Sequence, residues 1–261
     1  MPENEIRKSG AESTAKQSYI SATSGLKGKD YIGQDIGGFA GEKPDPELFL
    51  RWIAYGIFTP RFCLHSWNGD GSSTMPWLYP EEKKHVMALF GLRKKLLPYL
   101  FSEAMKAAEH YHPMIYPVFL KEEGYDEEAD CFFCGDSLLA CPIFDRGKNS
   151  VRVSLPHGYW FDGKAWRQGE VTYVNNPGDL PVFFIQEGSV VPMDEDDTIV
   201  FHLCPSENGC FTYRFYEDDG SIQNSYQSIE VTCSDKEIIV KGLCGKDEKL
   251  HDRLNRKLIL L

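Results

Sequence analysis

The chain has 261 residues, 42% of them hydrophobic and 13% aromatic, and a formal net charge of −11 at pH 7. This apolar content is enough for the core of one large or two ordinary domains, which excludes a disordered chain. The excess of acidic residues argues against binding to nucleic acid or to an anionic membrane surface, because phosphate recognition needs clustered Lys and Arg.

No apolar run reaches the roughly 20 residues of a membrane helix, and residues 1–30 are too polar for a signal peptide. We therefore expect a soluble protein of the cytoplasm. Its eight cysteines are expected to be reduced, although their even number leaves disulfides open for a secreted chain. Cys131 and Cys134 have the spacing of half a zinc site, but no second pair matches them. We expect neither a metal nor a cofactor.

The first predicted unit surrounds Asp35, which stands between glycines and apolar residues in residues 31–41. Residues 44–47 predict a helix start, because proline is tolerated in the first turn and acidic side chains complement the helix dipole. Apolar residues recur at helical spacing over residues 48–58, and a Thr-Pro pair then ends the helix. A short strand is expected to follow and to end at His65.

The order strand end, helix, strand end is typical of a β/α barrel, in which ligand-binding residues lie at the carboxyl ends of the strands. A barrel strand needs a neighbour on each side, so a barrel cannot begin at Asp35. Either earlier strands lie outside this chain or Asp35 belongs to a smaller fold. A further helix, opened by proline, is expected over residues 80–110 with a kink near Pro98.

From Pro113 onward the pattern changes to short apolar runs separated by turn residues, which is typical of an all-β sandwich. A second β region is expected to begin near Asp196. The predicted strands are residues 114–120, 136–144, 151–155, 158–162, 182–185 and 189–192 in the first region, and 198–202, 211–216 and 237–240 in the second.

Several blocks of sequence occur in an order that resembles glycoside hydrolase family 31, the α-glucosidase and α-xylosidase family. The blocks are residues 34–39 (QDIGGF), 51–65, 92–100 (LRKKLLPYL), 135–142 (GDSLLACP), 180–189 (LPVFFIQEGS) and 216–220 (YEDDG). The resemblance implies an α/β plus all-β chain. It would comprise the C-terminal part of a (β/α) TIM barrel at residues 1–112, a proximal β-sandwich at 113–195 and part of a distal β domain at 196–261.

The resemblance implies a retaining O-glycosyl hydrolase, in which one aspartate attacks the anomeric carbon and a second protonates the leaving oxygen. In the family, both aspartates precede the block that contains Asp35. The nearest candidate for the acid/base block is residues 9–14, where Ala11 occupies the place of the acid and Glu12 is an alternative, displaced acid. No nucleophile motif is found. We assign no catalytic residue and expect no hydrolysis by this chain alone.

The resemblance assigns Asp35 and His65 to neighbouring strand ends, where both bind hydroxyls of the sugar in the −1 subsite. A carboxylate accepts hydrogen bonds from two sugar hydroxyls, and an imidazole forms a hydrogen bond with another. Phe39 and Trp67 would supply aromatic faces for the C–H surface of the sugar. Cys63 stands where many members have arginine, which leaves glucose, xylose, galactose and N-acetylgalactosamine types open.

Each candidate also has a structural interpretation. Asp35 could cap a turn, His65 could be a hydrogen-bonded core histidine, and Phe39 and Trp67 could be packing residues. For the whole chain, the alternative to a part of a retaining α-glycoside hydrolase is a stand-alone carbohydrate-binding or structural β module. The expected partners are an α-linked oligosaccharide or glycoside, and either a complementary N-terminal chain or a second copy of this chain.

Overall fold

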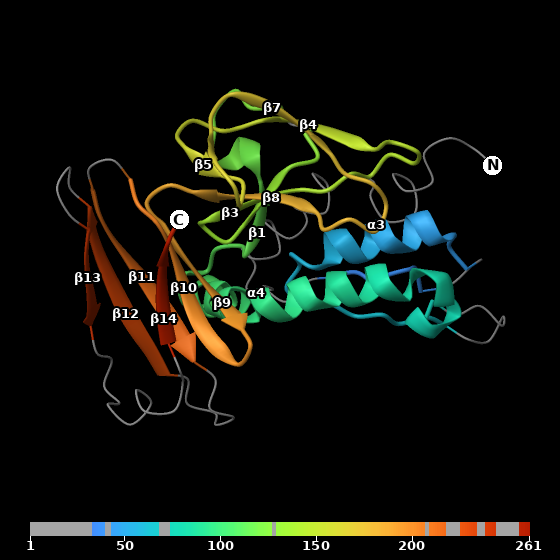
Figure 1. The fold of residues 1–261 in the computed structure, drawn as a ribbon, viewed down its shortest axis with the longest axis horizontal. Coiled ribbons are helices and arrows are strands. Elements are labelled where there is room, and N and C mark those ends of the chain that lie inside the picture. The colour runs from blue at the N-terminus through green and yellow to red at the C-terminus, as the bar shows by residue number, and fades with distance from the viewer. Residues whose placement is uncertain are drawn as a thin grey trace.

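The computed structural model describes residues 33–39, 43–67, 74–126, 129–206, 209–217, 225–233, 238–243 and 256–261. Two long helices lie beside a proximal β region, and a distal β region stands at the other end of the molecule (Figure 1). None of the helices in these described ranges is long and apolar enough to cross a bilayer.

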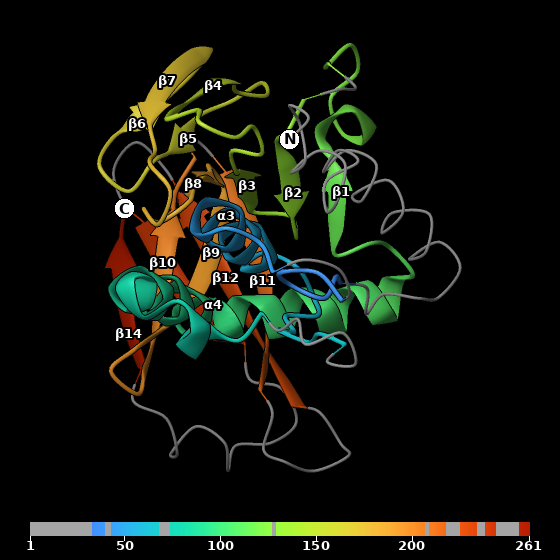
Figure 2. The ribbon, with the colours of Figure 1, turned by 90° about the vertical axis from the view of Figure 1, so that its right-hand side faces the viewer.

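The first described helix, α3, spans Pro46–Gly56 and confirms the helix predicted for this segment. Asp45 is its N-cap: the side chain accepts a hydrogen bond from Leu48 N at 3.0 Å, which satisfies one of the free amides of the first turn. Tyr55 packs edge-on against Phe132, with ring centroids 5.7 Å apart. The helix therefore lies between the second helix, α4 (Lys83–His110), and the proximal sheet (Figure 2).

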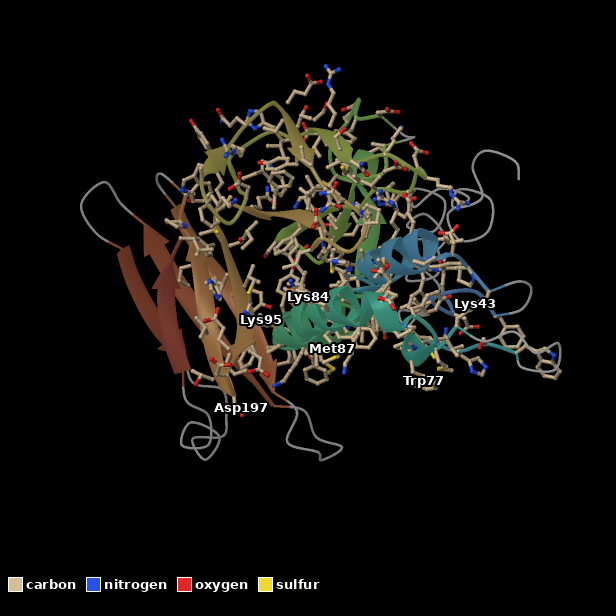
Figure 3. All side chains as sticks on the ribbon, turned by 45° about the vertical axis from the view of Figure 1, so that its right-hand side comes forward. Lys43, Trp77, Lys84, Met87, Lys95 and Asp197 are labelled. Atoms are coloured by element: carbon tan, nitrogen blue, oxygen red, sulfur yellow. The ribbon has the colours of Figure 1, made fainter. Side chains whose placement is uncertain are left out.

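The second helix, α4, spans Lys83–His110 and follows two short 3-10 turns, η1 at Pro76–Leu78 and η2 at Pro80–Glu82. It ends where Tyr111 adopts a left-handed backbone conformation with φ of 55°. One side of α4 packs against α3 and the distal strands. The other side faces solvent and carries exposed apolar side chains such as Met87 (Figure 3).

The proximal β region consists of two antiparallel sheets, one of six strands and one of two. The larger sheet has the order β1 (Ile115–Pro117), β2 (Phe132–Cys134), β3 (Leu138–Cys141), β8 (Val182–Gln186), β5 (Trp160–Phe161) and β6 (Trp166–Arg167), and the smaller pairs β4 (Ser150–Ser154) with β7 (Glu170–Val174). Val153 of β4 and Phe184 of β8 belong to one buried cluster, so the two sheets pack face to face.

Strand β1 is shorter than the predicted strand over residues 114–120. Its last residue, Pro117, has no N–H to donate to a neighbouring strand, so the ladder ends there. The next three residues form the 3-10 turn η3 (Val118–Leu120), which Lys121 N closes by donating to Val118 O at 2.9 Å.

The distal β region contains two three-stranded sheets. Their orders are β14 (Arg256–Leu260), β10 (Thr198–Cys204) and β9 (Ser189–Glu195), and β11 (Gly209–Glu217), β12 (Ser225–Cys233) and β13 (Ile238–Leu243). Asp196 and Asp197 form a two-residue turn between β9 and β10, with φ of 53° and 61°. Positive φ at both positions is typical of a type I′ hairpin. The predicted division between residues 195 and 196 falls between two paired strands of one sheet. Strand β9, which the sequence pattern assigned to the first β region, therefore lies in the distal sheet.

One hydrophobic core joins the helices to both β regions. It includes Ile36 next to Asp35, Leu138 of β3, Phe201 of β10 and Phe215 of β11. The rings of Phe201 and Phe215 meet edge-on with centroids 5.1 Å apart, which joins the two distal sheets. Because the core is shared, neither helix is packed independently of the sheets.

Candidate active site at two strand ends

Two segments, around Asp35 and around Cys63, run side by side in the same direction and meet at one parallel β-bridge between these residues. Ile36 N donates to Cys63 O at 2.8 Å. Gly33 permits the close approach, because a Cβ there would lie 2.3 Å from Arg61 O. The segments are neighbouring, as the sequence predicts, but their described pairing is a single bridge rather than an extended ladder.

Three rings gather just beyond this bridge. The Phe39 ring contacts His65, with centroids 5.4 Å apart, and Trp67, with centroids 6.3 Å apart. A hydrogen bond from Trp67 N to Phe39 O joins the two segments at this point. Phe39 is 46% exposed and Trp67 58% exposed, and His65 is also exposed. The interpretation of His65 as a core histidine is therefore wrong, and the rings present apolar faces to solvent.

The Asp35 carboxylate is bound by Arg61, whose Nη2 lies 2.6 Å from Oδ1. Arg61 Nη1 lies 3.5 Å from Gly33 O, so the guanidinium bridges the side chain and the backbone of one segment. The hydrogen bond to Asp35 raises the pKa of the Arg61 guanidinium above its usual value. Both side chains are partly exposed, and solvent screens the pair. Within the described residues, the Asp35 side chain binds the Arg61 cation and caps no turn, and Oδ2 accepts no hydrogen bond.

Helix α3 and the loop before η1 hold the Asp35 segment in place. Trp52 Nε1 of α3 donates to Gln34 Oε1 at 3.0 Å. Gly37 adopts φ of +87°, and a Cβ on it would lie 2.7 Å from Thr74 Cβ. Two glycines therefore follow Asp35 because the chain turns sharply there against neighbouring side chains.

Arg93 of α4 holds the segment that carries His65. Its Nη1 donates to Ile57 O at 2.6 Å and to Thr59 O at 2.7 Å, and its Nη2 donates to Pro60 O at 3.1 Å. Carbonyls at the end of a helix lack intrahelical donors, so one guanidinium satisfies the groups between α3 and the next strand end.

The structure brings Phe39, His65 and Trp67 together and places Asp35 on the adjoining segment. Sequence reasoning missed Arg61 as the partner of Asp35. Two features of the sequence could have identified Arg61. A partly buried carboxylate needs a counter-ion, and Arg61 begins the segment next to Asp35. The candidate acid/base block at residues 9–14, with Glu12, lies outside the described residues.

The cysteines and acidic residues do not form a metal site in the described part of the chain. Within those ranges, no group of three or more His, Cys, Asp or Glu side chains is arranged to hold an ion. Cys131 and Cys134 are buried free thiols in the proximal β region. Burial raises the pKa of the Cys134 thiol.

Two models of one protein family match the chain. The model of the glycosyl hydrolase family 31 TIM-barrel domain matches residues 8–103, and that of the family 31 C-terminal domain matches residues 111–191. The first match contains both strand ends of the candidate site, and the second covers most of the proximal β region.

Curated relatives agree with these models. The chain is 30% identical over 237 residues to the α-glucosidase of Saccharolobus solfataricus, covering 86% of this chain and 32% of that protein. It is 34% identical over 217 residues to a probable glucan 1,3-α-glucosidase of Oryza sativa subsp. japonica, covering 76% of this chain and 23% of that protein. The chain thus spans a third or less of the length of these relatives.

The fold is shared with solved structures. A Flavobacterium johnsoniae dextranase of family 31 in complex with glucose aligns with a TM-score of 0.76 and 26% identity, covering 87% of this chain and 31% of that chain. The glucosidase II α subunit aligns with a TM-score of 0.79 and 24% identity, covering 93% of this chain and 30% of that chain, which shows the fold alone. From the two family models and these relatives, we conclude that the chain belongs to glycoside hydrolase family 31.

Proposed function

We propose that this chain supplies the sugar-binding end of a retaining α-glycoside hydrolase that acts on α-glucosides or related α-glycosides. The observation that carries the proposal is the convergence of Asp35 with the rings of Phe39, His65 and Trp67 at two adjoining parallel segments. In β/α barrels, the carboxyl ends of the strands are where substrates bind. The names of relatives such as the Saccharolobus solfataricus α-glucosidase support the substrate class.

The chemistry of the site suits a sugar ring. Arg61 fixes Asp35 through Oδ1, so Oδ2 is oriented to accept from a hydroxyl. The exposed imidazole of His65 can donate to or accept from a second hydroxyl. Phe39 and Trp67 offer apolar faces on which the C–H surface of a pyranose packs. These roles make the four residues substrate holders rather than groups that break the glycosidic bond.

We further propose that the chain alone does not hydrolyse glycosides. Retention needs two carboxyl groups about 5–5.5 Å apart, whereas Asp35 is the one carboxylate in the described site and is paired with Arg61. A complementary barrel segment, in a longer protein or in a separate N-terminal chain, would supply the nucleophile and the acid. The exposed apolar side chains Met87 and Trp77, on and beside α4, offer it a contact surface (Figure 3), and Leu97 of α4 is exposed as well.

Two measurements test this proposal. The purified chain should release no 4-nitrophenol from the aryl α-glucoside or α-xyloside, yet methyl α-D-glucopyranoside should shift the amide resonances of residues 33–39 and 61–67. Asp35→Ala and His65→Ala should each remove these shifts, while the exposed Thr212→Ala of β11 serves as the matched control. Turnover that Asp35→Ala abolishes would overturn the statement that the catalytic groups lie elsewhere.

The second candidate function is a stand-alone carbohydrate-binding or structural β module. The shared core argues against it, because side chains near Asp35 and on α4 pack into one cluster with β3, β10 and β11. Limited proteolysis separates the two functions. A stable core that starts near Pro113 favours the module, and protection back to Asp35 favours a barrel segment.

The free thiols of the described cysteines support a cytoplasmic location, which we also propose.

A further inference from the structure

The proximal β region contains a pocket of about 600 Å³ that shares no lining residue with the strand-end site. Its walls come from residues 124–126 and 129–131, from residues 142–145 with Lys148, and from strand β4. Small-molecule sites typically enclose about 300–1,000 Å³, so the volume suits a small ligand. We call it the β4 pocket.

Hydrogen bonds hold two walls of the β4 pocket in position. Tyr125 Oη donates to Ser154 O at 2.5 Å, which joins the first wall to β4. Arg51, a buried residue of α3, donates to Lys148 O and so anchors the second wall on the helix. A pocket whose walls are fixed before binding loses less conformational entropy when a ligand enters.

The lining combines an apolar floor with a polar rim. Cys131, Ile143 and Phe144 are buried and form the apolar part. Ser150 and Ser154 are exposed and lie on the same face of β4, opposite the buried Val153, because side chains alternate along a strand. One side of a ligand would thus meet carbon and sulfur atoms, and the other would meet hydroxyl groups.

Charges of both signs surround the rim. Three carboxylates and two cations line it, namely Asp126, Asp130, Asp145, Lys148 and Arg152. Lys148 pairs with Asp145, and Arg152 pairs with Glu170 at 2.5 Å outside the lining. An anionic ligand would meet an excess of carboxylates. A neutral ligand with many hydroxyls can donate hydrogen bonds to the carboxylates and accept them from Lys148 and Arg152.

We propose that the β4 pocket binds a neutral mono- or disaccharide at a site distinct from the strand ends. The apolar floor packs against the carbon face of a pyranose, and the mixed rim exchanges hydrogen bonds with its hydroxyls. The proposal does not depend on the function of Asp35, since none of the strand-end residues contributes to the pocket.

Amide NMR spectra of the full chain, titrated with maltose, test the proposal. Saturable shifts are expected for residues 125–126, 129–131 and 143–154. Arg152→Ala should weaken binding about tenfold, because it removes a charged donor from the rim. Glu170→Ala is the matched control: it breaks the same exposed ion pair from outside the pocket and should change the affinity by less than about twofold. Asp35→Ala should leave these shifts unchanged.

A second pair of variants keeps the test decisive if Arg152→Ala perturbs the fold. Ser150→Trp fills the pocket and should abolish the shifts, whereas Thr212→Trp, at an exposed position of β11, should not. The proposal is overturned if maltose shifts only residues 33–39 and 61–67, or if Ser150→Trp and Thr212→Trp behave alike. It is also overturned if 1,4-diaminobutane or inorganic phosphate saturates the pocket amides and maltose does not.

Discussion

The strand-end site and a cluster around Glu103 use similar side chains in opposite surroundings. Glu103 of α4 is 3% exposed, and both of its carboxylate oxygens are engaged. Oε1 lies 2.5 Å from Lys106 Nζ and accepts from Tyr213 Oη of β11 at 3.2 Å, while Oε2 accepts from Asp136 N at 3.2 Å. We call these four residues the junction cluster, because they join α4 to the proximal and distal β regions.

The difference between the two regions lies in how completely the carboxylate is satisfied. Burial raises the pKa of Glu103, while Lys106 opposes that rise, so the junction cluster depends on keeping all its hydrogen bonds. Asp35 has one bonded oxygen and lies beside exposed rings. In the junction cluster, a buried carboxylate with both oxygens hydrogen-bonded stabilises the junction of three structural elements. In the exposed strand-end site, one carboxylate oxygen stays available to a ligand.

The largest effect is expected from breaking the junction cluster with Glu103→Ala. This change removes the acceptor that the Lys106 ammonium, the Tyr213 hydroxyl and Asp136 N share, and it leaves Lys106 with only the longer contact to Asp136 Oδ2 at 3.8 Å. We expect a loss of about 3–5 kcal/mol in the free energy of unfolding, measured by urea denaturation. Lys94→Ala, on the exposed side of α4, is the control and should cost less than about 1 kcal/mol. Equal losses in the free energy of unfolding for the two variants would refute the stabilising role of the junction cluster.

Gly135→Ala should disturb the same cluster from the β2–β3 turn. Gly135 has φ of +63°, and a Cβ there would lie 2.4 Å from Glu103 Cγ and 2.5 Å from Tyr99 Oη. Backbone strain and overpacking together predict a loss of about 2–3 kcal/mol in thermal or urea unfolding. Gly147→Ala is the matched control, because Gly147 also has a positive φ, of +73°, but nothing lies within 4 Å of the added Cβ. If Gly147→Ala costs as much, the tight contact with Glu103 is not the cause.

Arg61→Ala should affect the strand-end site without weakening the fold. The pair between Arg61 and Asp35 is partly exposed, so its loss should change the free energy of unfolding by less than about 1 kcal/mol. The affinity for methyl α-D-glucopyranoside should fall about tenfold, because the Asp35 carboxylate is no longer oriented. The affinity of Arg61→Lys should lie between those of the wild-type chain and Arg61→Ala, since an ammonium lacks the planar fork of a guanidinium. An unchanged affinity in Arg61→Ala would show that Arg61 does not position Asp35.

The smallest effect is expected from pH at the edge of the junction cluster. His112 Nε2 lies 3.7 Å from Asp136 Oδ1, and this interaction raises the pKa of His112 and lowers that of Asp136 to about 2. Because His112 has a raised pKa in the folded chain, its protonated form stabilises the fold fully at pH values below its ordinary pKa of 6.5. This stabilisation is lost as the pH rises through the pKa of the folded chain. Stability from Asp136 is present above 3.8 and is lost as the pH falls toward about 2.

The pair should therefore stabilise the fold most between about pH 4 and pH 6.5. The two side chains are 39% and 57% exposed, so solvent screening limits the effect to less than about 1 kcal/mol. Urea midpoints measured near pH 5.5 and near pH 8 should differ more in the wild-type chain than in His112→Asn. The same difference in both proteins would assign the pH dependence to other groups.

Local sequence signals located the helices and the candidate residues but not the partners of those residues. The Asp45 cap and Pro46 place the start of α3, because capping involves groups one turn apart. The pairing of Asp35 with Arg61 joins residues that are 26 positions apart and requires the segments to lie side by side. Strand β7 is absent from the predicted strands, because its side chains are largely exposed and its apolar signal is weak.

The sequence by itself determined where α3 begins, the presence of the long helix α4, the change to β structure after Pro113, and the candidates Asp35, Phe39, His65 and Trp67. These features depend on capping, hydrophobic periodicity and blocks of neighbouring residues, all of which act over short stretches of chain. The tertiary structure alone decided that β14 lies parallel to β10, that Arg61 binds Asp35 and that the β4 pocket exists. Each of these results from contacts between distant segments, whose closure depends on the packing of the whole core.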